Sequence, residues 1–293
     1  MTAEIDHLPV MREKVVEMLN VKQNGIYVDA TTGLGGHAEA VLHGIGSDGK
    51  LIGIDRDDEA LQRAKKRLSD SRVTLMQGNF ADMEYLLSTD GITSVDGVLF
   101  DLGVSSMQLR SPWRGFSFAS DAPLDMRMDR NQKLSAFDIV NRYPEHALEK
   151  IFREFGEERL SRKIAKAIIQ WRERKPIETC SELSQIVEKT YGTRGRIHPA
   201  TRTFQALRIA VNQELAQLTK GLHASLNLLN QGGRLCVISY HSLEDRIAKH
   251  FIADNAKKKV LRIITKKPIT PAPEELRTNP SSRSAKLRVA EKI

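Results

Sequence analysis

Five short apolar runs predict the strands of a buried sheet. Each has the length and the apolar or β-branched content of a strand that is covered on both faces. They are Ile26–Asp29, Leu51–Ile54, Val73–Met76, Gly97–Phe100 and Leu235–Ser239. Helical patterns separate the first four runs, and in Asp57–Leu68 the apolar residues fall on one helical face. This alternation predicts βαβ units and a parallel sheet.

After Phe100 the strand pattern stops for more than 130 residues, and helical periodicity replaces it. The apolar residues of 148–155 recur at helical spacing, and Thr179 with Glu182 forms a capping-box pattern. Before these helices, Arg110–Lys133 is rich in Gly, Ser, Pro and Asp, with Met and aromatic residues interspersed. We expect this stretch to be a mobile active-site loop.

The strand pattern resumes near the C-terminus. The helical pattern of Leu215–Leu229 and a turn at Gln231–Gly233 precede the run that ends at Ser239. Val260–Ile264 and Leu287–Ala290 then predict an antiparallel ribbon. We therefore expect one sheet domain made from two separated parts of the chain, with a loop and helical domain inserted between them. The expected ranges are 1–108 with 207–293 for the sheet domain and 109–206 for the insert.

Composition narrows the class of protein. The chain has 293 residues, of which 40% are hydrophobic and 28% charged, as in ordinary globular proteins. No apolar run is long enough to cross a membrane, and the N-terminus lacks the apolar core of a secretory signal, so we expect a cytoplasmic protein. Cys180 and Cys236 are far apart and have no partners at metal-ligand spacing, which predicts buried thiols and no metal site.

The net charge of +8 is unevenly distributed. Residues 1–108 contain 10 Lys and Arg against 17 Asp and Glu, whereas 109–206 contain 19 against 13 and 246–293 contain 13 against 4. Clustered basic residues favour a polyanion partner because they neutralise phosphates and release counterions. We expect the basic terminal segment from Asn279 onward to contact phosphates. A tail that is charged only for solubility is the alternative.

A glycine-rich turn follows the first strand. Gly33 and Gly35 lie where a strand passes into a helix, and glycines there allow the backbone to approach a nucleotide-like ligand. The spacing also fits the dinucleotide fingerprint, so the turn alone does not separate NAD from S-adenosylmethionine. Asp55, at the end of the second strand, can accept both ribose hydroxyls. Asp29 favours a cofactor with a cationic amino-acid end, because its carboxylate would repel a pyrophosphate.

Two further positions are candidates for contact with the ligand. Asp101 ends the fourth strand, at the edge where open α/β sheets place reacting groups. Its alternative role is to cap the following turn. Phe80 follows the third strand, where it either lies against the adenine ring or belongs to the core.

Seven motifs occur in an order and spacing that are highly specific. They are His7-x-Pro9-Val10-Met11, Gly35-Gly36-His37, Asp101-Leu102-Gly103-Val104-Ser105-Ser106, Arg114-Gly115-Phe116-Ser117-Phe118, Asp125-Met126-Arg127-Met128, Tyr240-His241-Ser242-Leu243-Glu244-Asp245-Arg246 and Asn279-Pro280-x-Ser282-Arg283-Ser284. Through these motifs, which are spread over nearly the entire chain, the sequence resembles the bacterial small-subunit (16S) ribosomal RNA cytosine-N4 methyltransferases, the MraW type. One departure is Ala30-Thr31-Thr32, where the family commonly shows Gly-Thr.

The resemblance implies a class I methyltransferase fold: a Rossmann-like α/β domain with a mostly parallel sheet and helices on both faces, interrupted by a small all-helical domain. It implies S-adenosylmethionine as cofactor. The substrate that it implies is a specific cytidine in ribosomal RNA of the small subunit, either free or in the assembled subunit. The cofactor contacts that it implies are Gly35, Gly36, His37, Asp55, Phe80, Asp101 and Gln108.

Methylation of the exocyclic N4 needs a proton acceptor, because the lone pair of this nitrogen is delocalised into the ring. We expect Asp101 to be this catalytic group. Many amino-methyltransferases carry an Asp/Asn-Pro-Pro-aromatic motif at this point, but this chain has Asp-Leu-Gly-Val. A stacking aromatic must therefore come from elsewhere. The candidates are Trp113, Phe116, Phe118, Tyr240 and His241.

Other activities are less well supported. Methylation at carbon-5 of cytosine needs a thiolate, but Cys180 lies in the helical insert and Cys236 inside a strand. An NAD-dependent oxidoreductase is the rival enzyme, and a non-catalytic RNA-binding or ribosome-assembly protein is the rival without catalysis. We expect no membrane partner, and the sequence leaves a homodimer open.

Overall fold

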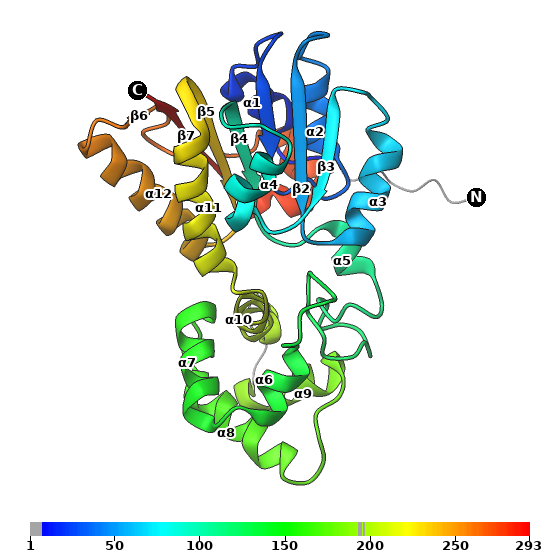
Figure 1. Cartoon of the computed structure of the whole chain (residues 1–293). Coiled ribbons are helices and arrows are strands. Elements are labelled where there is room, and N and C mark those ends of the chain that lie inside the picture. The colour runs from blue at the N-terminus through cyan, green and yellow to red at the C-terminus, as the bar shows by residue number, and fades with distance from the viewer. Residues whose placement is uncertain (1–7, 193–194, 196) are drawn as a thin grey trace. The chain divides into compact units, whose positions relative to one another are not determined.

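The structure is a computed structural model that describes residues 8–192, 195 and 197–293. The chain forms two compact units (Figure 1). The first comprises the chain up to Gly103 together with Leu215–Ile293, and the second is Val104–Glu214. Compared with the expected boundaries at 108/109 and 206/207, the helical unit therefore begins earlier and ends later. His7, which belongs to the first family motif, lies outside the described residues.

The first unit is built on a seven-stranded sheet with the order β3-β2-β1-β4-β5-β7-β6. The strands are β1 Ile26–Asp29, β2 Lys50–Asp55, β3 Val73–Gln77, β4 Val95–Asp101, β5 Leu229–Ser239, β6 Leu261–Ile263 and β7 Lys286–Lys292. The first five strands pair in parallel, whereas β7 is antiparallel to both β5 and β6. The predicted α/β fold with a mostly parallel sheet is confirmed, as is the terminal ribbon of β6 and β7.

Alternating side chains of the strands enter two different cores. Val28 and Ile52 belong to one core, and their neighbours Tyr27 and Leu51 belong to the other. Helices therefore cover both faces of the sheet, as predicted (Figure 1). The helical elements of this unit are α1 Arg12–Leu19, α2 Gly36–Leu42, α3 Asp58–Arg67, η1 Phe80–Asp82, α4 Met83–Thr89, α11 Glu214–Leu228, α12 Ser242–Lys257, α13 Pro273–Thr278 and η2 Pro280–Ser284. The first residue of α11, Glu214, is counted with the other unit.

The predicted turn at Gln231–Gly233 is wrong as a boundary, because β5 runs through it from Leu229 to Ser239. Leu229 pairs with Val95 and Arg234 with Gly97, so β5 gains residues that have no partners on β4. Gly232 lies within this irregular stretch with a φ of 78°. Glycine permits that left-handed backbone, which explains why the sequence resembles a turn although the strand continues.

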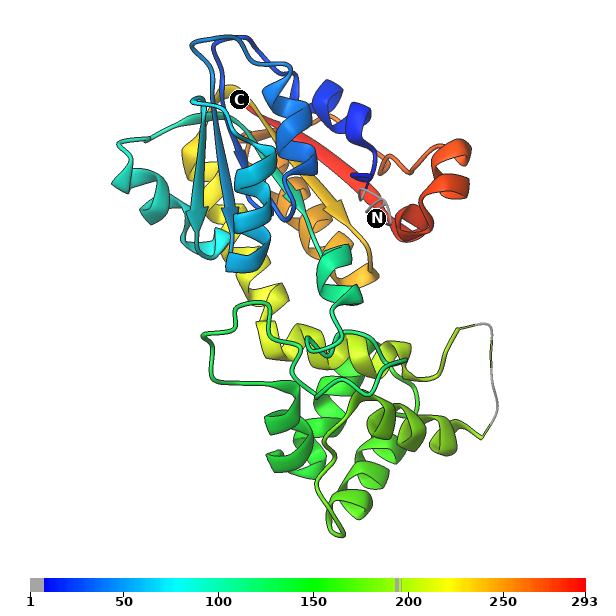
Figure 2. The same cartoon turned by 90° about the vertical axis from the view of Figure 1, so that its right-hand side faces the viewer.

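The basic C-terminal segment from Asn279 onward contributes a strand to the sheet, in line with the ribbon predicted at Leu287–Ala290, and its contact with phosphates stays a prediction. Strand β7 lies between β5 and β6 (Figure 2, red). Leu287 and Val289 are fully buried, and the Arg288 guanidinium binds the Asp245 carboxylate, with 2.6 Å between Nε and Oδ1. Removal of this segment would therefore remove a strand together with its core side chains.

In the described part of the second unit the regular elements are helices. They are α5 Ser106–Arg110, α6 Ala136–Arg142, α7 Glu145–Gly156, α8 Ser161–Arg172, α9 Cys180–Tyr191 and α10 Ala200–Asn212, and a long irregular segment joins α5 to α6. Leu148, Phe152, Ile164 and Leu183 are fully buried in its core. The capping box that Thr179 and Glu182 predict is present at the start of α9. The insert thus has a core of its own, separate from those of the sheet.

The segment 110–133 is irregular, as expected, but its packing argues against the predicted mobility. Leu124 and Met126 are 1% exposed and belong to the core of the helical unit. The Arg114 guanidinium donates to the carbonyl oxygen of Met128 at 2.9 Å, and Pro123 forms a β-bridge with Thr179. Motion of the segment as a whole would expose these apolar side chains to water.

Among the residues that the structure describes, no helix is both long enough and apolar enough to span a membrane.

Candidate active site

The glycine turn between β1 and α2 adopts a backbone that other residues rarely reach. Gly33 and Gly35 have φ values of 51° and 81°. The Gly35 N–H donates to the carbonyl oxygen of Thr32 at 2.8 Å, which closes the turn. A Cβ on Gly36 would lie 2.7 Å from Cγ of Pro9, so a side chain there would clash. The turn therefore needs glycine both for its dihedral angles and for space.

The Asp55 carboxylate joins the end of β2 to this turn. Oδ2 accepts a hydrogen bond from the Gly33 N–H at 2.7 Å, and Oδ1 accepts one from the Asp57 N–H at 2.9 Å. Burial raises the pKa of Asp55, and the two backbone donors oppose that shift. Asp55 thus organises the turn, a role that the sequence did not predict. Its proposed contact with ribose hydroxyls would be a second role for the same carboxylate.

Asp29 is a buried carboxylate at the end of β1. Its side chain is 2% exposed, and its Oδ1 accepts the Thr31 N–H at 3.2 Å. Burial raises the pKa of Asp29 to about 6, while the charge of His37 lowers it. A buried acid of this kind is costly to ionise unless a cation lies beside it. The site is therefore suited to a cationic group of a ligand.

Asp101 ends β4 and has a polar partner on each carboxylate oxygen. The Tyr240 hydroxyl donates to Oδ1 at 2.8 Å, and His37 Nε2 lies 3.4 Å from Oδ2. The Asp101 N–H donates to the Thr31 hydroxyl oxygen at 2.6 Å, which ties the end of β4 to the loop after β1. His37 is 5% exposed, and among the described residues neither ring nitrogen has a hydrogen-bond partner. Buried nitrogens of this kind could bind a ligand.

The sequence did not predict that Tyr240 contacts Asp101. The signal lies in the strand order, because β5 is parallel to β4 and Ile238 pairs with Asp101. A side chain just beyond the end of β5 therefore lies near the end of β4. In sequence these two residues are 139 positions apart, so only the correct sheet order brings them together.

Two residues that the sequence predicts as cofactor contacts have evident structural roles. Phe80 is 9% exposed and packs edge to face on Phe100, with 5.4 Å between ring centroids, so it belongs to the core. Gln108 lies in the helical unit, where its side chain accepts the Ser105 N–H at 3.1 Å in the capping box of α5. Their contacts with a cofactor stay predictions.

The candidates for a stacking aromatic differ in exposure and in the partners they have. Phe116 is 7% exposed, and Phe118 stacks on His198 with 4.3 Å between ring centroids. Trp113, in contrast, is 53% exposed. The other two candidates are Tyr240, which binds Asp101, and His241, whose Nε2 lies 3.1 Å from Oε1 of Glu244.

Both cysteines are buried thiols, as predicted. Burial raises the pKa of Cys180 to about 12 and also raises the pKa of Cys236. The Cys180 thiol donates to the carbonyl oxygen of Gly115 at 3.3 Å. A thiol with a raised pKa is a poor source of thiolate, so neither residue suits nucleophilic attack on a cytosine ring.

These features gather at one edge of the sheet. The carboxylates of Asp29, Asp55 and Asp101 end β1, β2 and β4, and the glycine turn follows β1. From β1 the chain continues to β2 and β3 on one side and then returns to β4 on the other side of β1, so the strand order reverses between β1 and β4 and this edge is the topological switch point. With β7 inserted antiparallel beside β5, this strand order is that of a class I methyltransferase.

Comparison with known proteins identifies the family. The model of the MraW methylase family matches residues 4–293. Two similar relatives are both named "Ribosomal RNA small subunit methyltransferase H". The protein from Persephonella marina is 50% identical over 99% of this chain and 100% of its own, and that from Caldicellulosiruptor bescii is 49% identical over 98% and 99%. The chain belongs to the MraW methylase family.

Proposed function

We propose that the protein uses S-adenosylmethionine to methylate the exocyclic N4 of a specific cytidine in small-subunit ribosomal RNA. The observation that carries this proposal is that about half of the residues, over nearly the full length of the chain, are identical to those of proteins named ribosomal RNA small subunit methyltransferase H. The site supports it because Asp101 ends β4, the middle strand of the seven, at the edge of the sheet where the parallel strands have their carboxyl ends. We further propose that the protein acts in the cytoplasm, where ribosomal RNA is available.

The residues at the sheet edge fit S-adenosylmethionine. Asp29 is a buried acid that needs a cation, and the amino-acid end of this cofactor supplies one. The buried imidazole of His37 could bind its polar groups, since among the described residues the polar contact of its ring nitrogens is that of Nε2 with Asp101 at 3.4 Å, and Asp55 could accept the ribose hydroxyls. When bound, the cofactor supplies an electrophilic methyl group. Within the glycine turn the open space lies beside Gly33, where a Cβ would meet only the Thr31 carbonyl oxygen at 3.8 Å, whereas Leu68 and Pro9 fill the space beside Gly35 and Gly36.

Asp101 supplies the acid–base chemistry of the proposal. A carboxylate that accepts a hydrogen bond from N4 draws the lone pair of the nitrogen toward the incoming methyl group and then receives the proton. Much of the rate would come from holding the two reactants in line.

The rival activities fit the site less well. A pyrophosphate would be repelled by the Asp29 carboxylate, which argues against NAD. Attack by a thiolate on carbon-5 of cytosine is disfavoured because both cysteines are buried and have raised pKa values. A non-catalytic RNA-binding protein would not need three acids at the ligand edge of its sheet.

The test is to identify the methylated nucleoside. Small-subunit RNA and isolated subunits would be incubated with the protein and methyl-labelled S-adenosylmethionine, then digested and separated by liquid chromatography with mass spectrometry. We expect label in N4-methylcytidine with wild type and a large loss with Asp101→Asn. Asp96→Asn is a matched control, because Asp96 lies near the start of the same strand and accepts the Ile26 N–H at 3.0 Å. Label in another nucleoside, or none with either substrate, would overturn the proposal.

A further inference from the structure

The Tyr240 hydroxyl makes a direct hydrogen bond with the acid proposed to receive the N4 proton. It donates to Oδ1 of Asp101 at 2.8 Å, and both residues lie in the sheet unit. A free carboxylate rotates about its terminal bond, whereas one that accepts a hydrogen bond from a fixed donor keeps one orientation. With Oδ1 engaged by Tyr240, Oδ2 is the oxygen left on the side of His37, whose Nε2 is 3.4 Å away.

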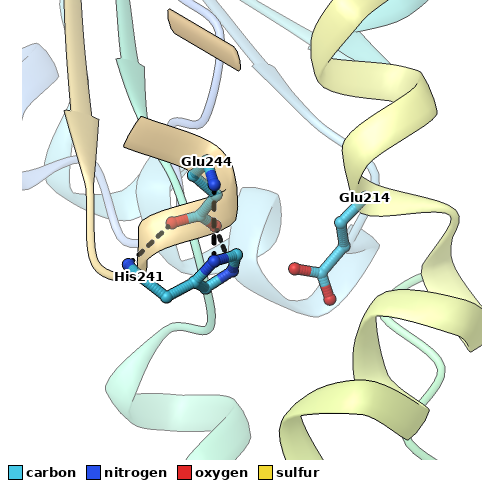
Figure 3. Close-up of side chains that lie close together, drawn as sticks. All are labelled: Glu214, His241 and Glu244. Atoms are coloured by element: carbon cyan, nitrogen blue, oxygen red, sulfur yellow. Dashed lines mark hydrogen bonds and ion pairs between the residues drawn. The ribbon is translucent and has the colours of Figure 1, made fainter. Parts of the chain in front are cut away.

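The tyrosine is itself held in place by the start of α12. Glu244 is 2% exposed, and its Oε2 accepts the Tyr240 N–H at 2.9 Å and the His241 N–H at 3.3 Å. Figure 3 shows the Glu244 carboxylate beside His241 at this helix start. Glu214, also drawn there, belongs to the other unit, where the Arg208 guanidinium binds its carboxylate at 2.9 Å. A buried acid thus fixes the main chain of Tyr240.

The ring of Tyr240 is also confined. Its Cδ2 would lie 3.6 Å from a Cβ built on Gly103, so the ring packs over the backbone that follows Asp101. Gly103 has a φ of 100°, which glycine adopts readily and other residues do not. Main chain, ring and hydroxyl of Tyr240 therefore all have defined neighbours within the same unit.

We propose that Tyr240 is a positioning residue for the methyl transfer, whose hydroxyl holds the Asp101 carboxylate in the orientation that receives the N4 proton. This inference rests on the proposed function. In the reaction a bond forms between N4 and the methyl carbon, the bond between that carbon and the donor sulfur breaks, and one N4 proton passes to Asp101. The Tyr240 proton stays on its own oxygen throughout.

The surroundings favour a tyrosine that donates and does not ionise. Burial, followed by the charge of Asp101, raises the pKa of Tyr240 well above its ordinary value. The phenol therefore keeps its proton over the pH range in which a methyltransferase would be assayed. Tyr240 acts by fixing an orientation, because a group so reluctant to ionise is a poor proton relay.

The experiment is a double-mutant cycle on the rate of a single turnover. Wild type, Tyr240→Phe, Asp101→Asn and the double variant would be mixed with saturating S-adenosylmethionine and RNA. We expect Tyr240→Phe to slow methylation by roughly 10- to 100-fold, the usual effect of a misplaced catalytic group. In the Asp101→Asn background the same change should matter by less than about twofold, since the group to be positioned has lost its function. Cofactor affinity, measured by calorimetry, should be unchanged by Tyr240→Phe.

Tyr27→Phe is the matched control. The Tyr27 hydroxyl is also hydrogen bonded, since it accepts the Lys22 N–H at 2.7 Å, and it has no described contact with Asp101. We expect this variant to keep the wild-type rate. If Tyr240→Phe is unfolded at the assay temperature, Glu244→Gln replaces it in the cycle, because that change weakens the hold on the Tyr240 main chain.

The outcomes separate the two proposals. Equal losses from Tyr240→Phe in both backgrounds would mean a structural role and would overturn the inference, as would a normal rate. A wild-type protein that forms no N4-methylcytidine would overturn the proposed function itself, before any variant is compared.

Discussion

We propose that Asp29 binds the cationic end of the cofactor at the expense of the protein's stability. Its carboxylate is 2% exposed, and burial raises its pKa to about 6. An aspartate in the unfolded chain has a pKa of about 3.9, and a difference of about 2 corresponds to roughly 3 kcal/mol. Because the folded pKa is the higher one, the folded chain binds more protons between about pH 4 and pH 6. The free energy of unfolding should therefore fall as the pH rises through this range.

We predict that Asp29→Asn stabilises the protein at pH 7 while weakening its cofactor binding. The amide removes the buried charge but keeps an oxygen for the Thr31 N–H. Urea unfolding should show a gain of about 1–3 kcal/mol at pH 7 and a smaller gain at pH 4. Calorimetry should show weaker binding of S-adenosylmethionine by about 1–3 kcal/mol, because a charged partner is removed. An unfolding free energy with the same pH dependence in both proteins would contradict the assignment of this pKa to Asp29.

A second prediction at this scale concerns Asp101. The change Asp101→Asn should lower single-turnover methylation at saturating substrates by about 10²–10⁴-fold, the usual contribution of a general base. Binding of cofactor and RNA should change far less, since the amide keeps the shape and can still accept the Tyr240 hydrogen bond. A rapid-quench time course of methylated product measures this rate. A near-normal rate at saturation would mean that another group receives the proton.

At the scale of elements, Asp55 joins a strand to a turn. Its carboxylate accepts the N–H groups of Gly33 and Asp57, so the end of β2 holds the turn that follows β1. We predict that Asp55→Ala weakens cofactor binding by about 1–3 kcal/mol, because hydrogen bonds to a charged group are removed. The matched comparison is Asp55→Asn, which keeps one acceptor for the turn and should bind more tightly than Asp55→Ala. If calorimetry shows that both variants are folded and bind the cofactor with wild-type affinity, Asp55 is not part of the cofactor site.

The sequence predicts the elements well where local pattern decides them. The parallel strands and α3 appear where the apolar runs and the apolar face of Asp57–Leu68 place them. The sequence does not predict an element correctly where a segment far away in the chain determines its structure. Strand β5 passes through the Gln231–Gly233 signal because β4 pairs on both sides of the irregular stretch. The segment 110–133 looks like a mobile loop because its burial depends on helices far along the chain.

The same distinction applies to the site. The positions of the acids and glycines were predictable because each acid ends a strand, the glycines follow one, and parallel strands end at one edge. The role of Asp55 in the turn and the contact between Tyr240 and Asp101 depend on hydrogen bonds across the sheet. Such contacts cannot be predicted from composition and motif spacing until the strand order is known.

For the whole molecule, the basic residues near the C-terminus belong partly to the folded core and partly to the surface. Residues 246–293 carry 13 basic and 4 acidic residues, yet Arg288 is 9% exposed and paired with Asp245. Part of the basic excess therefore stabilises the sheet and is not available to RNA. The exposed part includes four lysines around β6. They are Lys258, Lys259, Lys266 and Lys267.

We predict that these four lysines bind RNA phosphates, so that changing all four to glutamine weakens RNA binding and flattens its salt dependence without unfolding the protein. Each phosphate that is no longer neutralised should reduce the slope of log affinity against log salt by about 0.7, because fewer counterions are released on binding. The control is Lys65→Gln with Lys66→Gln on α3, two exposed lysines in the acidic part of the chain. Fluorescence anisotropy over a salt series measures both slopes. A slope equal to wild type in the fourfold variant would show that the basic excess here serves solubility, since a lysine that neutralises a phosphate cannot be replaced without reducing the number of ions released.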